Sequence, residues 1–212
     1  MTQRSPAFEK TYRMYLAKLA GLDLEARAAL LGFEVDDGAA VVPLYGRPHR
    51  VTPRGVTDPA GVRPIHSVSV LLCQYLLLGP STEPPAGAQW VTYKDFRDAA
   101  PFVDGFVNNS ERTIARSFSG RLDELEEACQ ALGGEAPDLE VSYQVKMRFD
   151  ALPRVPVVLL YNDEDEEFPS ESTILFERRA ERYLDMECLA ILGWMLADRL
   201  AEEASGAGRT VM

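Results

Sequence analysis

The chain is poor in the residues that most often mark catalytic or metal-binding sites. Its 212 residues include three cysteines and two histidines. Cys73, Cys129 and Cys188 stand singly in helix-like apolar patterns, so we interpret them as buried thiols and expect neither disulfides nor a CxxC site. Nucleophile elbows, phosphate-binding glycine loops, HExxH motifs and dinucleotide fingerprints are all missing from the sequence. The motifs therefore predict no catalytic residue, no cofactor and no metal ligand, and any histidine-dependent catalysis would have to use His49 or His66.

Basic residues are also scarce. The chain has 22 lysines and arginines against 33 aspartates and glutamates, a formal charge of −11. This balance argues against binding to nucleic acid or to an anionic membrane surface, because both need clustered cations. The longest apolar run, Val68 to Leu78, is shorter than the roughly 18–20 residues that cross a bilayer. Charges interrupt the N-terminal segment, so a secretory signal is not indicated. We expect a soluble cytoplasmic protein.

Patterns of both helical and strand type are present. Helical spacing begins after Ser5, after Asp23 and after Asp185, each of which is suited to cap a helix. The predicted helices cover about 6–19, 24–31, 66–78, 103–118, a segment capped by Ser119, a brief turn at 178–183, and a long apolar helix after Asp185. The predicted strands cover 33–35, 40–44, 47–52, 90–93, 141–149, 155–161 and 174–176. Proline and glycine predict an extended loop over 52–64.

The order of these elements predicts the fold class. Strands come mainly as hairpins and no regular βαβ alternation occurs, which favours an α+β fold with a mixed or antiparallel sheet packed on helices. Val155 to Tyr161 is apolar on both faces and is expected to be a central strand. The proline-rich loops are too short to separate two self-sufficient patterns. We therefore predict one domain over 1–204, followed by a disordered tail over 205–212.

Several short segments of the sequence together resemble a known family. These are LYGRPHRVTP, WVTYKDF, the helix ending in ALGGE, and the long segment from Phe149 to Trp194. They are similar to an uncharacterised prokaryotic family, number three-seven-eight-six among the domains of unknown function, which is common in anaerobes. Some members are fused to iron-sulfur domains, which implies a setting in anaerobic redox or corrinoid and one-carbon metabolism. This chain has no such cysteine-rich extension, and the family supplies no catalytic residues.

An acidic run follows the predicted central strand. Asp163, Glu164, Asp165, Glu166 and Glu167 are consecutive. A calcium-binding loop that began at the first of them would need glycine at its sixth position and glutamate at its twelfth, and the sequence has phenylalanine and isoleucine there. Three interpretations remain open: a solvated turn that protects a sheet edge, a surface that docks a partner or ligand, and a metal site.

An arginine-rich segment is the second charged feature. Arg47, Arg50, Arg54 and Arg63 are accompanied by one acid, Asp58, and the two histidines flank or lie within the segment. Arginine offers paired donors to phosphate and carboxylate groups, so the segment predicts an anion site. A contact with the acidic run inside the molecule, or surface charge without function, would give the same pattern.

Two hypotheses of function follow. The first is an accessory or binding protein that presents the acidic run and the arginine-rich segment to a protein partner or a small anionic ligand. Its candidate binding residues are Arg47, His49, Arg50, Asp163, Asp165, Glu166 and Glu167. The second is a metal-assisted hydrolase that uses carboxylates of the acidic run with His49 as a base.

Overall fold

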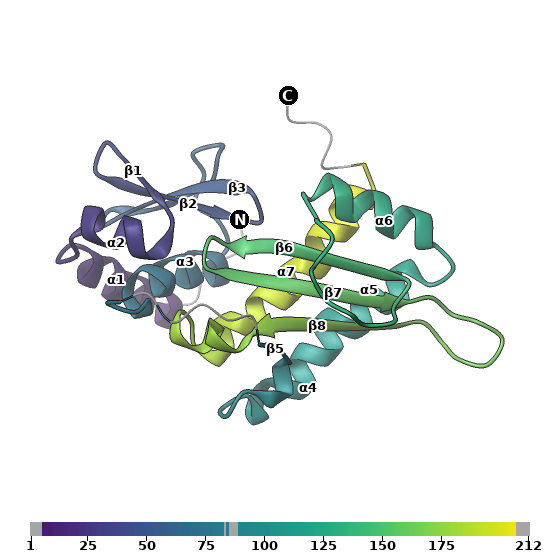
Figure 1. Cartoon of the computed structure of the whole chain (residues 1–212). Coiled ribbons are helices and arrows are strands. Elements are labelled where there is room, and N and C mark those ends of the chain that lie inside the picture. Colours follow the sequence, from purple (N-terminus) through teal and green to yellow (C-terminus); the bar gives the residue numbers. More distant parts are fainter. Residues whose placement is uncertain (1–5, 83, 85–88, 207–212) are drawn as a thin grey trace.

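The computed structural model describes residues 6–82, 84 and 89–206, which form two antiparallel sheets and a set of helices (Figure 1). The strands are β1 (Glu34–Asp36), β2 (Ala39–Leu44), β3 (Arg47–Thr52), β4 (Gly55–Thr57), β5 (Trp90–Thr92), β6 (Val145–Leu152), β7 (Val155–Asn162) and β8 (Glu171–Glu177). The α-helices are α1 (Pro6–Leu19), α2 (Leu24–Leu31), α3 (His66–Leu78), α4 (Val103–Phe106), α5 (Arg112–Phe118), α6 (Leu122–Ala131) and α7 (Met186–Ala204). A π-helical turn, η3 (Val107–Glu111), joins α4 to α5, and 3₁₀ turns occupy η1 (Tyr93–Asp95), η2 (Ala100–Phe102) and η4 (Arg178–Arg182).

The N-terminal sheet is a meander in the order β1-β2-β3-β4. Its two tight turns use residues with positive φ, Asp37 and Gly38 in the first and Tyr45 and Gly46 in the second. Two-residue hairpins favour such turns because their twist matches that of the strands. The sheet packs with α1, and the hydroxyl of Tyr12 accepts a hydrogen bond from the N–H of Val56. The turn at Tyr45 brings the start of β3 against the C-terminal helix.

The C-terminal sheet has the order β5-β8-β7-β6, so β7 is an interior strand. All its residues from Val155 to Tyr161 are buried. The strand β5 has three residues and covers only the last part of β8, from Leu175 to Glu177. Beyond that point the N–H of Ile174 is bound instead by the carboxylate of Glu111, at 3.0 Å. A helix side chain thus continues the pairing where the edge strand stops.

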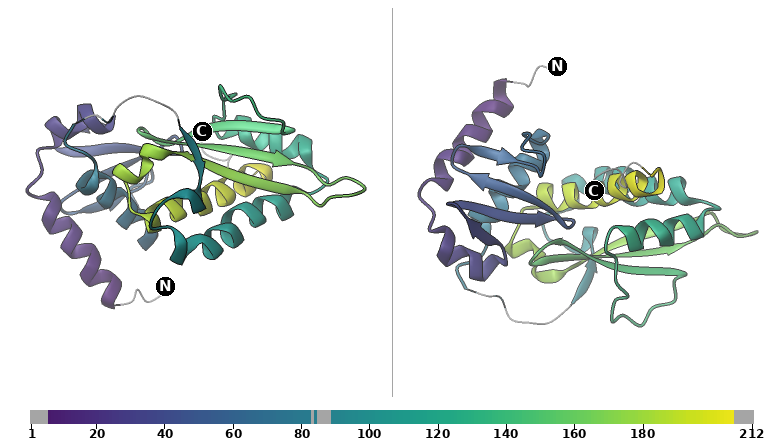
Figure 2. Two further views of the ribbon diagram at one scale, coloured as in Figure 1. Left: turned by 60° about the horizontal axis from the view of Figure 1, so that its bottom comes forward. Right: turned by 90° about the horizontal axis from the view of Figure 1, so that it is seen from above.

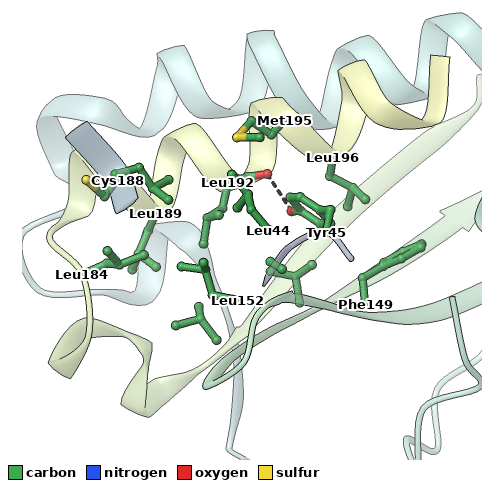
Figure 3. Packing of buried hydrophobic residues seen from close by; sticks show 14 of the residues in the cluster. Leu44, Tyr45, Phe149, Leu152, Leu184, Cys188, Leu189, Leu192, Met195 and Leu196 are labelled. Carbon is green, nitrogen blue, oxygen red and sulfur yellow. Dashed lines mark hydrogen bonds between the residues drawn. The ribbon is translucent and has the colours of Figure 1, made fainter. Parts of the chain in front are cut away.

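The long helix α7 lies across one face of the C-terminal sheet (Figure 2). It is capped by Asp185, whose carboxylate accepts from the N–H of Cys188 at 2.8 Å. Figure 3 shows Leu189 and Leu196 directed from this helix toward the sheet, and the Tyr45 hydroxyl hydrogen-bonded to the carbonyl of Leu192. These contacts fix the helix against both sheets. One cluster of buried apolar side chains extends from α1 through the two sheets to α7.

Most of the predicted elements are confirmed. The α+β class, the interior position of β7, the caps at Asp23 and Asp185, and the helix His66–Leu78 agree with the structure. The predicted cap at Ser5 and the tail beyond residue 206 lie outside the described residues. The prediction of one domain over 1–204 stays a prediction. Within the described part of the chain, none of the helices is long and apolar enough to cross a membrane.

Four predicted elements were wrong in detail. The loop over 52–64 contains β4, which pairs with β3 despite the neighbouring prolines and glycines. The strand predicted from Val141 begins at Val145 and continues to Leu152, and β8 is longer than 174–176. The helix predicted over 103–118 is widened by the π-helical turn, which brings Glu111 to the edge of β8. Apolar spacing carries no signal for such a turn, because its cause is a distant strand.

Ser119 does not cap the helix that follows it. Its hydroxyl donates to Glu164 at 2.8 Å, and α6 begins after Arg121 without a side-chain cap. The N–H of Gly120 donates to Asp163 at 2.8 Å. The turn before α6 is therefore held by the acidic run, a long-range contact that its local sequence does not reveal.

Candidate ligand-binding cleft

The two charged segments lie at opposite ends of the molecule. Arg47, His49 and Arg50 are on β3, in the N-terminal sheet, whereas the acidic run forms the loop that projects between β7 and β8 (Figure 1). The second and third views agree with this separation (Figure 2). The structure therefore does not combine the two segments into one site. A catalytic pair of His49 with a carboxylate of the run, as in the hydrolase hypothesis, has no geometric basis.

The acidic loop uses two of its carboxylates to hold its own backbone. Oδ1 of Asp163 accepts from the N–H of Gly120, from the N–H of Glu164 at 2.9 Å and from the hydroxyl of Tyr161 at 3.1 Å. Oδ1 of Asp165 accepts from the N–H groups two and three residues later, both at 2.8 Å. These two donors lower the pKa of Asp165. This is the pattern of a turn stabilised by aspartate side chains.

The side chains beyond Asp165 point to solvent. Glu166, Glu167 and Phe168 are exposed, and Phe168 keeps 66% of its surface accessible. Over residues 6–82, 84 and 89–206, no group of three or more histidine, cysteine, aspartate and glutamate residues is placed to hold a metal ion. Only the outer part of the loop is therefore available for contact with another molecule.

The arginines of β3 are engaged in different pairs. Arg50 forms a surface ion pair with Asp36 of β1. Arg47 reaches across to the end of α7, where its Nη2 lies 3.2 Å from Glu202 and 3.5 Å from Glu203. Arg47 and Arg50 thus do not converge on a common anion position, and Arg50 lies outside the cleft described next.

A cleft of about 290 Å³ lies between β3, the loop before α3, and α7. It is lined by Arg47, His49, Asp58, Pro59, Pro64, Ile65, Val68, Trp194, Met195, Asp198, Arg199 and Glu202. Three separate parts of the chain build it. The β3 strand supplies the histidine, the loop after β4 supplies one aspartate, and one face of α7 supplies the tryptophan and most of the charges.

His49 is the most buried polar residue of this cleft, with 3% of its surface exposed. Its Nδ1 lies 2.8 Å from the carbonyl oxygen of Arg47, so Nδ1 carries the proton and Nε2 is an acceptor in the neutral ring. Burial lowers the pKa of His49, although the bond to Arg47 and the nearby Asp58 oppose that shift. Within the described chain Nε2 has no hydrogen-bond partner and is not sealed from solvent. It is therefore an unused acceptor on a residue that lines the cleft.

Asp58 and Asp198 are two of the carboxylates that line the cleft. Oδ1 of Asp58 accepts from the N–H groups of Ala60 at 2.9 Å and Val62 at 2.8 Å, which folds the loop before α3. Asp198 forms neither a hydrogen bond nor an ion pair with the residues that the structure describes. Burial and the carboxylate of Glu202 raise the pKa of Asp198. Asp198 is exposed, so its carboxylate is accessible to a ligand in the cleft.

The face of α7 that lines the cleft was missed in the sequence. Trp194, Asp198 and Glu202 recur at intervals of four, so they form one stripe on the helix. The leucines at 189, 192, 196 and 200 dominate the apolar pattern of this helix, and the sequence was therefore interpreted only as a helix that packs in the core. An aromatic residue aligned with two acids on the other face was the available signal.

The fold and the cleft define an α+β protein with an open polar pocket between its N-terminal sheet and its longest helix. The chain belongs to the family described as domain of unknown function (DUF3786), whose model matches residues 23–199. This confirms the resemblance seen in the sequence. The matched range includes the cleft-lining residues except Glu202, and it excludes α1. No curated protein and no solved structure matches the chain.

Proposed function

We propose that this protein binds a small ligand in the cleft between β3 and α7. One observation carries the proposal: His49 is almost fully buried, yet its Nε2 remains without a partner in the described structure and lines an open cavity. Because this acceptor keeps contact with solvent at a cavity wall, a ligand donor can replace the water bound there. Among the described residues that line the cleft there is no serine, threonine, cysteine or lysine, and binding is the activity that we propose.

The chain offers a direct reporter for this proposal. It has two tryptophans, and only Trp194 lines the cleft, whereas Trp90 is on β5. A screen of small acids, amines and neutral compounds by NMR should find molecules that shift the indole N–H signal of Trp194 and leave that of Trp90 unchanged. Absence of any such compound across the three charge classes would overturn the proposal.

A matched pair of substitutions tests the location. Ile65 and Leu78 are exposed aliphatic residues at opposite ends of α3, and only Ile65 lines the cleft. Ile65→Phe should fill part of the cleft and weaken each hit, whereas Leu78→Phe should leave binding unchanged. Equal effects of the two substitutions would place the ligand elsewhere.

A second candidate function is docking of a protein partner on the outer part of the acidic loop. The exposed ring of Phe168 beside Glu166 and Glu167 supports it, because an aromatic residue flanked by unused charges is suited to an interface. Phe168→Ser combined with Glu166→Gln and Glu167→Gln should remove any partner captured by the wild-type protein. Asp163 and Asp165 are unsuitable for this test, since their carboxylates hold the loop backbone.

A further inference from the structure

The cleft is rich in hydrogen-bond acceptors that no group of the described structure uses. Oδ2 of Asp58, the carboxylate of Asp198 and Nε2 of His49 all belong to residues that line it. The other oxygen of Asp58 is already occupied by two N–H groups. A ligand that satisfied these acceptors would need several donors.

One terminal nitrogen of each cleft arginine is already engaged. Arg199 Nη1 lies 2.9 Å from Glu202, and Arg47 binds Glu202 and Glu203 from the other side. The two guanidinium groups therefore share one carboxylate within the cleft. Glu202 therefore offsets part of the positive charge that an incoming anion would meet, whereas an incoming cation would meet Asp58 and Asp198, for which the described structure has no ion pair.

The charge balance points in the same direction. Two arginines, Arg47 and Arg199, stand against three carboxylates, Asp58, Asp198 and Glu202, which leaves the lining at −1 with His49 neutral. The chain as a whole carries −11, so its long-range field also attracts cations.

The remaining walls are apolar. Ile65, Val68 and Met195 line the cleft together with the indole ring of Trp194. A tryptophan ring attracts a cation placed over its face, and its edge packs against hydrocarbon. The cleft therefore suits a molecule with an apolar body and a charged head.

We infer, on the basis of the proposed small-ligand site, that the ligand is an amine, bound by its ammonium or guanidinium group between Asp58, Asp198 and Nε2 of His49. Three such acceptors match the three N–H donors of a primary ammonium. This inference reverses the sign of charge that the arginine-rich segment predicts, because the structure shows the cleft arginines paired within the molecule.

Three probes of one shape test the charge of the ligand. Benzylamine, benzyl alcohol and benzoate share a phenyl ring and carry a positive, a neutral and a negative head at pH 7. Titration of each into the full chain, followed by the indole signal of Trp194, should show benzylamine binding most tightly. The preference over benzyl alcohol should be on the order of tenfold or more, the value of one hydrogen bond to a charged group.

Substitutions of aspartate by asparagine, which remove one negative charge each, then test which carboxylates bind the amine. Asp58→Asn keeps an oxygen that accepts from Ala60 and Val62, so the loop should stay folded while the charge is lost. Asp58→Asn and Asp198→Asn should each weaken benzylamine severalfold and leave benzyl alcohol unchanged. Asp138→Asn makes the same change of charge in the exposed loop before β6 and should have no effect on either.

The outcomes separate this inference from the proposed function. Tighter binding of benzoate, or equal binding of benzylamine and benzyl alcohol, overturns the inference, as does an equal response to all three asparagine variants. If benzylamine fails but other compounds in the wider screen shift Trp194, the inference is overturned and the proposed function stands. If no compound of any charge shifts Trp194, both are overturned.

Discussion

The acidic loop and the cleft use carboxylates in opposite ways. In the loop, Asp163 and Asp165 accept hydrogen bonds from backbone N–H groups, so the most conspicuous charges in the sequence are largely structural. In the cleft, Asp198 lacks any partner among the described residues and faces another acid, Glu202. The comparison teaches that density of charge is a poor guide to function. A single acid without a partner among the described residues can be a better candidate for ligand binding than an acid that is part of a long run.

The largest expected effect concerns Asp163. Asp163→Ala removes the acceptor of Gly120 and of the Tyr161 hydroxyl, so we expect the free energy of unfolding to fall by about 1.5–3 kcal/mol, the range for hydrogen bonds to a charged group. Urea denaturation measures this change. Glu167→Ala is the control from the same loop and should have almost no effect. Equal stability of the two variants would contradict a structural role for Asp163.

A smaller effect on stability is expected at Asp58, whose carboxylate both accepts hydrogen bonds from the backbone and lines the cleft. Asp58→Ala removes the acceptor of two backbone N–H groups and should cost about 1 kcal/mol, whereas Asp58→Asn retains that acceptor and should cost much less. Thermal unfolding of the two variants measures the difference. If both lose the same stability, the negative charge rather than the hydrogen bonding holds the loop.

The third prediction concerns the pH dependence that His49 contributes. Burial lowers the pKa of folded His49, and an unfolded histidine titrates near pH 6.5. Between these two values the unfolded state binds more protons, so His49 lowers the stability as the pH falls below about 6.5. The hydrogen bond to the Arg47 carbonyl and the charge of Asp58 oppose this lowering of the pKa, and the guanidinium charge of Arg47 adds to it. His49→Asn should reduce the loss of stability between pH 7 and pH 5, and an unchanged loss would show that His49 is not held neutral.

The smallest effect, and the one of opposite sign, is expected at Asp198. Asp198→Asn removes the repulsion of Glu202 one helical turn away and should raise the free energy of unfolding at pH 7 by about 0.2–0.5 kcal/mol. The same variant is expected to weaken amine binding. Chemical denaturation at pH 7 measures the gain. A loss of stability would mean that this acid is structural, as in the loop.

The sequence was informative where local rules decide the structure. Asp23 and Asp185 cap helices, Asp37 and Gly38 form a tight turn, and the uniformly apolar Val155–Tyr161 segment is an interior strand. Each follows from spacing and residue type within a few positions. The fold class follows from the order of such elements.

The candidate site could be predicted only in part. His49 and Arg47 were singled out, but as an anion site, because their sequence neighbours are basic. Two acids change the interpretation of the charge of this site: Glu202, which pairs with Arg47, and Asp198, which lines the cleft. Both lie about 150 residues away on α7. The turn at Gly120 and the π-helical turn at Glu111 also depend on long-range contacts, with residues 43 and 63 positions away. Local patterns carry no information about which charges meet across the fold.

The most direct test of the account is the ¹⁵N spectrum of the His49 imidazole at pH 7, recorded with and without benzylamine. The structure predicts a neutral ring with the proton on Nδ1, and a shift of the unprotonated Nε2 signal when the amine binds. His49→Asn identifies the signal by its loss. A ring that carries its proton on Nε2, or an Nε2 signal that saturating benzylamine leaves unchanged, would contradict the proposal that this cleft is a binding site for an amine.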